Sequence, residues 1–150
     1  MADWTLRPAT AADVTAVAEI RAVAMRPDLV RLGRYDEGRV RQRLRDAWAP
    51  AHTWVIEVGG EAAGAVALRR AADCYWFEHF LLAPELQGRG IGTAVLDSLL
   101  ERCDREDVPV RLNVLQGSAA RRLYERRGFT VEREDPVDVF MVRRPRTGTA

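Results

Sequence analysis

The amino-acid sequence predicts an α/β (α+β) fold built on a mixed β-sheet, and three observations indicate it. A strand-like segment at 75–83 is followed by a helical segment at 90–106 and a second strand at 110–115. This is the order of a parallel βαβ unit, which is almost always right-handed. The pair Gly59-Gly60 separates two further strand-like segments, as in an antiparallel hairpin. Helical patterns precede and follow these strands, so helices are expected to cover the sheet.

The N-terminal part of the chain is expected to contain one strand and two helices. Residues 4–7 form the first strand, and Thr10 is placed to cap a helix whose first turn contains Asp13. Apolar residues then recur at helical spacing until Pro27, which is expected to end the helix. After an irregular stretch, residues 36–48 are predicted to form the second helix.

The remaining elements alternate between strands and helices. Residues 53–58 and 62–68 are the strands of the hairpin. The helix at 90–106 is amphipathic, because apolar residues recur every four positions at Ile91, Val95, Leu99 and Cys103. A short helix at 118–127 is expected to stop at Gly128 in a left-handed cap. The last two strands are predicted at 130–134 and 137–143.

The composition fits a single globular domain over residues 1–150. The chain has a net charge of +1 and is 47% hydrophobic, so no overall field favours nucleic acid or an anionic membrane. No apolar run reaches the roughly 20 residues of a membrane span, and the first residues lack the pattern of a signal peptide. A cytoplasmic protein is therefore expected.

Cysteine and histidine give no sign of a metal site. Cys74 and Cys103 lack the spacing of metal ligands and are expected to be buried as small apolar residues. His52 and His79 are isolated in the sequence, and the acidic residues are scattered. All 23 basic residues are arginine, so no lysine can act as a nucleophile.

A glycine-rich segment, Gln87-Gly88-Arg89-Gly90-Ile91-Gly92-Thr93, lies between a predicted strand and a predicted helix. Glycines at such a point let a phosphate approach backbone N–H groups at the positive end of the helix dipole. A tight strand–helix turn without a ligand is the alternative. The segment is neither a P-loop, which needs a lysine, nor a dinucleotide fingerprint, since Thr93 or Val95 stands where a third glycine or alanine is required.

The pattern Gln-x-x-Gly-x-Gly at 87–92 resembles that of the GCN5-related N-acetyltransferase (GNAT) family. Further similarities run in the family's order along nearly the whole chain: Leu-Arg-Pro-Ala-Thr at 6–10, Leu-Ala-Pro-Glu at 82–85, Leu-Asn-Val at 112–114, the segment 120–129 ending in Gly-Phe, and Val-Phe-Met-Val at 139–142. The resemblance implies a mixed, mostly antiparallel sheet of about six to seven strands, flanked on both faces by about four helices. The sheet would open between strands 75–83 and 110–115 to admit acetyl-coenzyme A.

The resemblance also implies which residues bind acetyl-coenzyme A as cosubstrate. The glycine-rich segment would hold the pyrophosphate, and the backbone near Leu82 and Ala83 would supply oxyanion donors. Ser118 stands where the family often has asparagine, so its contact with the pantetheine arm is in question, although serine can still hydrogen-bond and cap the next helix. The full set is Leu82, Ala83, Gln87, Gly88, Arg89, Gly90, Ile91, Gly92, Thr93, Ser118 and Arg121.

Tyr124 and Glu78 are the candidate catalytic residues. Tyr124 matches the family's conserved tyrosine, which implies that it protonates the departing thiolate; packing beside Phe129 is the alternative. Glu78 shares a strand face with Trp76 and Phe80, where burial would make it a better base, but a position at the sheet rim or pairing with arginine is equally compatible.

Two further groups bear on proton removal. His79, on the opposite strand face, could also serve as the base. Asn113 stands near where the family sometimes has a catalytic acid, and an amide cannot take a proton. A water relay or an already neutral amine is a further alternative.

The acceptor is expected to be a primary amine of a small molecule that attacks the thioester directly. By resemblance it would meet residues 25–46, a stretch with seven arginines that either attracts an anionic acceptor or forms a solvated surface balanced by acidic residues. A peptide or protein N-acetyltransferase and a non-catalytic acyl-coenzyme A-binding module are the alternatives. Neither nucleic acid nor a membrane is expected as a partner, and a homodimer is possible.

Overall fold

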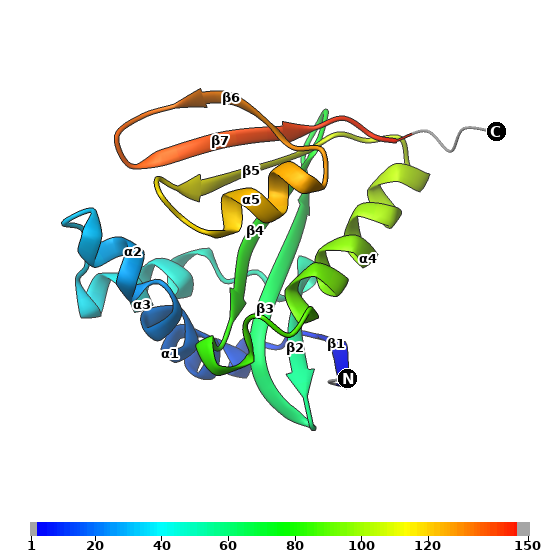
Figure 1. Ribbon diagram of the computed structural model, residues 1–150. Coiled ribbons are helices and arrows are strands. Elements are labelled where there is room, and N and C mark those ends of the chain that lie inside the picture. The colour runs from blue at the N-terminus through cyan, green and yellow to red at the C-terminus, as the bar shows by residue number, and fades with distance from the viewer. Residues whose placement is uncertain (1–2, 147–150) are drawn as a thin grey trace. The chain divides into compact units, whose positions relative to one another are not determined.

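The computed structural model describes residues 3–146 (Figure 1). Its seven strands follow the order β1-β2-β3-β4-β5-β7-β6. They are β1 (Trp4–Pro8), β2 (Thr53–Val58), β3 (Glu61–Arg70), β4 (Tyr75–Leu82), β5 (Val110–Leu115), β6 (Thr130–Glu134) and β7 (Asp138–Arg143). The pairs β1–β2, β2–β3, β5–β7 and β6–β7 are antiparallel, whereas β4 and β5 are parallel. The predicted mixed, mostly antiparallel sheet with a parallel βαβ unit is confirmed.

Five α-helices lie in the described part of the chain: α1 (Val14–Ala24), α2 (Arg26–Arg31), α3 (Glu37–Ala47), α4 (Ile91–Arg105) and α5 (Ala120–Arg126). Over residues 3–146 no helix combines the length and apolar character that crossing a bilayer requires.

The chain divides into two compact units. Of the described residues, the first contains 3–67 and 79–92, and the second contains 68–78 and 93–146. The division passes through β3, β4 and the start of α4. The expectation of a single domain stays a prediction.

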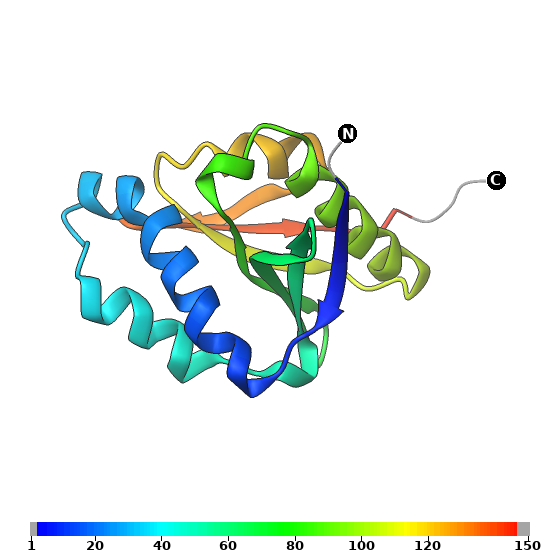
Figure 2. The same cartoon turned by 90° about the horizontal axis from the view of Figure 1, so that it is seen from below.

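In the first unit, α1 and α3 lie side by side (Figures 1 and 2). They share an apolar core with β3 and the end of β4, made of Val17, Ala18, Leu44, Ala65 and Leu81. The β2–β3 hairpin turns at Gly59 and Gly60, whose φ angles of 61° and 82° fit the predicted tight turn.

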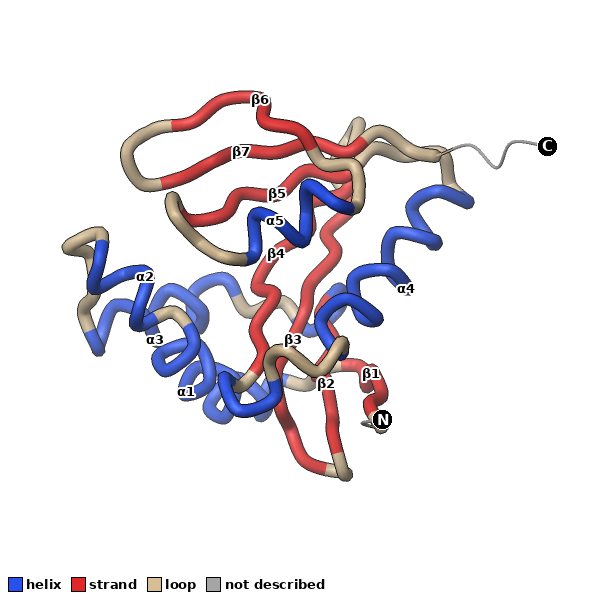
Figure 3. The backbone as a smooth tube through the Cα atoms, in the orientation of Figure 1, coloured by secondary structure: helices blue, strands red, loops and turns tan. Residues whose placement is uncertain are grey.

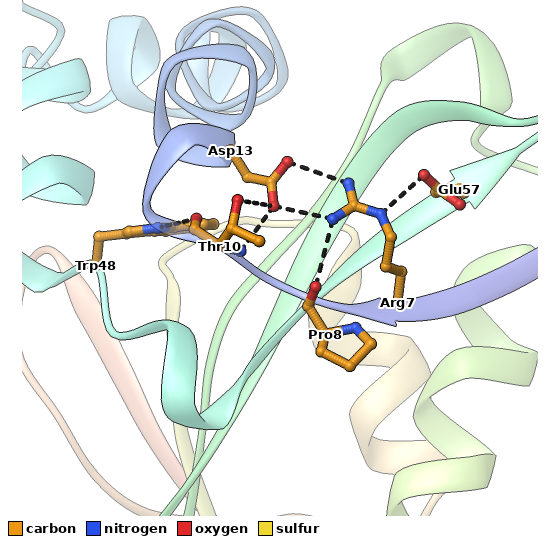
Figure 4. A network of polar contacts seen from close by, with 6 residues as sticks. All are labelled: Arg7, Pro8, Thr10, Asp13, Trp48 and Glu57. Carbon is orange, nitrogen blue, oxygen red and sulfur yellow. Dashed lines mark hydrogen bonds and ion pairs between the residues drawn. The ribbon is translucent and has the colours of Figure 1, made fainter.

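The entry into α1 is held by a polar network around Asp13 (Figure 4). Asp13 Oδ2 accepts hydrogen bonds from Thr10 N at 2.8 Å and from Thr10 Oγ1 at 3.1 Å, which confirms the predicted helix start. Arg7 links this carboxylate to β2, because its Nη1 lies 3.0 Å from Asp13 Oδ2 and its Nε 2.9 Å from Glu57 Oε2. Asp13 lies in the 3₁₀ turn Ala11–Asp13 that leads directly into α1, so the network fastens β1, this turn and β2 to one another.

This network is expected to make stability depend on pH. Hydrogen bonds from Arg7 lower the pKa of Asp13 from 3.8 to about 2. A lowered carboxyl pKa stabilises the folded state above the unfolded value and loses that contribution as the pH falls from about 4 towards 2. Asp13→Asn is expected to cost about 1 kcal/mol at pH 7, the scale of a lost helix cap at a partly exposed site. In the variant, the free energy of unfolding, measured with urea between pH 5 and pH 2, is also expected to fall less with decreasing pH than in the wild type. A fall as steep as that of the wild type would contradict this role.

The second unit combines the β5–β7–β6 ladder with α5 and most of α4 (Figure 1). Its apolar core includes Val95, Val110, Leu112, Val139 and Met141. Arg143 is buried and forms a bidentate ion pair with Asp104. Its Nη1 donates to Oδ1 at 2.8 Å and its Nη2 to Oδ2 at 3.0 Å. This pair ties the end of β7 to α4.

The stretch between the first two predicted helices is not irregular. It contains α2, and Pro27 lies in the first turn of this helix. Proline fits that position because its fixed φ suits a helix and the missing N–H has no partner there. The preceding helix ends at Ala24, so Pro27 lies inside the next helix and does not itself end the first.

Candidate active site

The glycine-rich segment connects β4 to α4 (Figure 3). Gly88 and Gly90 have φ angles of 79° and 81°, a region that L-residues with a side chain rarely adopt. A Cβ added at either residue would meet no atom within 4 Å. The backbone shape, rather than crowding, therefore requires glycine here. Gln87 supports the segment, because its Nε2 donates to the carbonyl oxygen of Leu82 at 3.0 Å.

The helix that follows begins at Ile91, which is buried, and runs for 15 residues. The N–H groups of its first turn have no partner within the helix, and the helix dipole places positive potential there. Gly92 approaches Phe80, since a Cβ at Gly92 would lie 3.5 Å from Phe80 Cζ. Arg89 is exposed, and Thr93 is partly buried. These features agree with the expected phosphate-binding role of the segment from Gln87 to Thr93, which stays a prediction.

The end of β4 is already engaged in hydrogen bonds. The N–H of Ala83 donates to the carbonyl oxygen of Ala63 at 2.8 Å. Ala83 could act as an oxyanion donor only by giving up this bond, so its expected role stays a prediction that the geometry does not favour. Leu82 has its carbonyl group bound by Gln87 and stays a candidate through its N–H.

Tyr124 is held in an apolar environment in the second unit. Its ring packs edge-on against Phe77 at a centroid distance of 6.2 Å and against Phe129 at 5.7 Å. Tyr124 is 6% exposed, and burial raises the pKa of its hydroxyl. The hydroxyl makes no hydrogen bond to any residue between 3 and 146.

The two expectations for Tyr124 are therefore compatible. Its ring packs as a core residue, while its hydroxyl stays protonated and free to bond a ligand. Gly128 ends α5 with a φ of 93°, and the N–H of Phe129 donates to the Tyr124 carbonyl at 3.1 Å. This left-handed cap was predicted from the sequence, and it fixes the position of Tyr124 relative to Phe129.

Glu78 is paired with an arginine. Its carboxylate accepts from Arg69 Nε at 2.9 Å and from Arg69 Nη2 at 3.2 Å, and its side chain is 30% exposed. Pairing with arginine was the alternative to a base role, and the guanidinium engages both carboxylate oxygens. A base role for Glu78 stays a prediction.

His79 carries a feature that the sequence did not reveal. Its φ is 50°, so the backbone turns left-handed in the middle of β4. Backbone of this kind is found more often beside functional sites. It also interrupts the strict alternation of strand faces on which the placement of Glu78 and His79 was based. The parallel ladder between β4 and β5 covers Tyr75–Val110 and Trp76–Arg111, before His79.

The remaining predicted residues lie around α5 and β5. Ser118 Oγ accepts from the N–H of Ala120, the first residue of α5, at 3.2 Å, but the N-cap position of this helix is Ala119. Arg121 forms a pair with Glu125 one turn later, at 3.4 Å. Asn113 donates from Nδ2 to Asp138 Oδ1 at 3.1 Å. Its exposed side chain is thus oriented by β7.

Both cysteines are buried and unpaired, as predicted. Burial raises the pKa of the Cys103 thiol to about 11, so it remains protonated near neutral pH. In the described part of the chain, histidine, cysteine and acidic residues form no group of three that could hold a metal ion.

Comparison with known proteins identifies the class. Residues 15–129 match the acetyltransferase (GNAT) family, so the chain belongs to this family and the predicted resemblance is confirmed. No curated protein matches it in sequence.

Solved structures share the fold at low sequence identity. The PaiA N-acetyltransferase from Thermoplasma acidophilum, crystallised with coenzyme A, superimposes with a TM-score of 0.77 at 18% identity, covering 95% of this chain and 99% of that one. The ribosomal-protein-S18-alanine N-acetyltransferase from Escherichia coli gives 0.75 at 18% identity, with 97% of both chains covered. PH1933 from Pyrococcus horikoshii gives 0.76 at 21%, with 96% and 99% covered.

Proposed function

We propose that this protein transfers the acetyl group of acetyl-coenzyme A to a primary amine of a small molecule by direct attack. Membership of the acetyltransferase (GNAT) family supplies the reaction class. The Tyr124 hydroxyl carries the proposal, because it is protonated, set among apolar rings and without a hydrogen-bond partner in residues 3–146. A group of this kind can donate a proton to a leaving thiolate.

The glycine-rich segment fits a diphosphate. Two left-handed glycines with open space around them precede the N-terminus of a 15-residue helix. Backbone N–H groups and the helix dipole would together bind the pyrophosphate of acetyl-coenzyme A. The PaiA enzyme, which has the same fold, was crystallised with coenzyme A. Ser118 and Arg121 are proposed to contribute further polar contacts.

In the proposed reaction the neutral amine nitrogen attacks the thioester carbonyl carbon. The carbon–nitrogen bond forms, the carbon–sulfur bond breaks, and sulfur takes the proton of Tyr124 as the thiol leaves. The attacking nitrogen must also lose one proton to become the amide nitrogen. Because Glu78 is bound to Arg69, we favour a water relay that carries this proton from the nitrogen to the Tyr124 oxygen and so restores the phenol.

Release of free thiol from acetyl-coenzyme A tests the proposal. The reaction is offered separate sets of amino acids, polyamines, aminoglycosides and short peptides. Turnover with one small-molecule class would support the proposal, and turnover with peptides alone would replace small molecules by peptides. Tight binding of acetyl-coenzyme A without turnover on any amine would favour a non-catalytic binding module.

Gly90→Ala is expected to weaken acetyl-coenzyme A binding about tenfold in isothermal titration calorimetry. The left-handed backbone at φ 81° costs a residue with a Cβ about 1–2 kcal/mol. The loop is expected to avoid this strain by adopting another backbone conformation. The N–H groups would then no longer converge on the pyrophosphate.

Gly59→Ala is the matched control. Gly59 is also left-handed, at φ 61°, with no atom within 4 Å of an added Cβ, but it lies in the β2–β3 turn. It is expected to lower stability by a similar amount and to bind acetyl-coenzyme A normally. Equal affinities of the two variants would argue against a pyrophosphate site in this loop.

A further inference from the structure

Arg21 occupies an unusual position on the inner face of α1. One helical turn separates it from Val17 and from Met25, and Ala18 lies three residues before it. Val17 and Ala18 belong to the core of the first unit, and Met25 packs against it. The Arg21 side chain is partly buried, so it is a charged group on the otherwise apolar stripe of α1.

The guanidinium of Arg21 is only partly satisfied. Its Nε donates to the carbonyl oxygen of Val40 on α3 at 2.9 Å. Its two terminal nitrogens make no hydrogen bond or ion pair with any residue between 3 and 146. A guanidinium has five N–H donors, so four stay available. The bond to Val40 orients the group without neutralising it.

The other arginines in the described part of the chain that are partly or fully buried differ from Arg21. Each has a carboxylate oxygen within 3.4 Å, and they are Arg7, Arg41, Arg69, Arg111, Arg121, Arg127 and Arg143. Burying a charge without a counter-ion is costly, and folding alone gives no reason to keep it. An anion supplied from outside the chain would give Arg21 the negatively charged partner that the other arginines have.

A second positive charge lies near this group. Burial, and then the charge of Arg43 on α3, lower the pKa of Arg21. Arg43 is itself exposed and makes no ion pair within residues 3–146. Two like charges without a carboxylate between them raise the local positive potential on the α1–α3 pair.

We propose that Arg21, assisted by Arg43, binds an anionic group, a carboxylate or a phosphate, on the amine acceptor. This inference rests on the proposed acetyltransferase function and assigns the acceptor to the class of amines that carry a negative charge. The planar fork of Arg21 matches two oxygens of either group. Strongly cationic amines such as polyamines would be disfavoured by the same charges.

Anion binding can be measured without any acetyl transfer. The arginine Nε–H signals of the full-length protein are followed by NMR during titration with sodium acetate and, separately, with inorganic phosphate, at constant ionic strength adjusted with sodium chloride. The Arg21 signal is expected to shift saturably with at least one anion. If acetate saturates the signal at the lower concentration, the site prefers a carboxylate; if phosphate does, the site prefers a phosphate.

Arg105 is the internal control, because it is an exposed arginine without a partner among residues 3–146 and lies on α4. Its signal is expected to drift without saturation. An Arg21 signal that moves no more than that of Arg105 in both titrations would overturn the proposal, whether or not the protein acetylates an amine.

Two variants extend the test. Arg21→Gln is expected to weaken binding of the preferred anion at least about tenfold, and Arg21→Lys, which keeps the charge but not the fork, by less. Arg105→Gln is expected to leave it unchanged. Equal binding by Arg21→Gln and the wild type would also overturn the proposal.

Discussion

Tyr124→Phe is expected to lower kcat for acetyl transfer by about 10²–10³-fold, the usual contribution of a general acid. The Kd for acetyl-coenzyme A should change less than about twofold. The variant removes one hydroxyl that makes no hydrogen bond within residues 3–146 and leaves the ring contacts with Phe77 and Phe129 in place. Thiol release measures kcat, and calorimetry measures the Kd.

The pH profile gives a second measure of the same role. Burial raises the pKa of Tyr124, so the hydroxyl stays protonated across the range in which an ordinary tyrosine begins to ionise. The wild-type kcat is therefore expected to show no alkaline loss up to about pH 10. A decline centred below pH 9 would point to another acid.

Tyr75→Phe is the matched control, since Tyr75 is also buried and lies in the second unit. Its hydroxyl donates to Glu106 at 2.7 Å, so the substitution removes a structural hydrogen bond. It is expected to cost about 1 kcal/mol of stability and to leave kcat unchanged. If Tyr124→Phe kept full kcat, the tyrosine would be a packing residue only.

The sequence predicts the elements whose signals are local. The β2–β3 turn follows from Gly59-Gly60, the start of α1 from Thr10 and Asp13, and the end of α5 from Gly128. In each case the residue types that fix the backbone lie within four positions of one another. The parallel βαβ unit also follows, because a long amphipathic helix joins two apolar strands.

Features that depend on distant partners could not be predicted in this way. Glu78 was placed by assuming unbroken alternation along β4, whereas the left-handed backbone at His79 interrupts it. The sequence also does not show that Arg69, across the β3–β4 connection, takes both oxygens of Glu78. Arg21 was missed for a related reason, since only the packing of α1 on α3 shows that it lacks a counter-ion.

Gly64→Ala is expected to have the largest effect on stability of any substitution considered. Gly64 lies on β3 opposite Ile56, next to an irregular step in the β2–β3 ladder. An added Cβ would overlap the carbonyl oxygen of Leu81 and lie 3.0 Å from the Cα of Leu82. These are backbone atoms, so no side-chain rotation can relieve the clash. The free energy of unfolding is expected to fall by about 3 kcal/mol, the upper range for overpacking.

The same displacement would reach the glycine-rich segment. Leu82 anchors Gln87 through its carbonyl oxygen, and Ala83 is bonded to Ala63, so a shift of this strand end moves the start of the loop. Urea unfolding measures the first effect, and calorimetry with acetyl-coenzyme A the second. Gly38→Ala is the control, because its Cβ would lie 3.6 Å from Asp36 Oδ1, an ordinary contact within α3. It is expected to raise stability by about 0.5–1 kcal/mol. A loss below about 1 kcal/mol in Gly64→Ala would mean that β3 and the end of β4 can separate freely, and glycine would then not be required for their close approach.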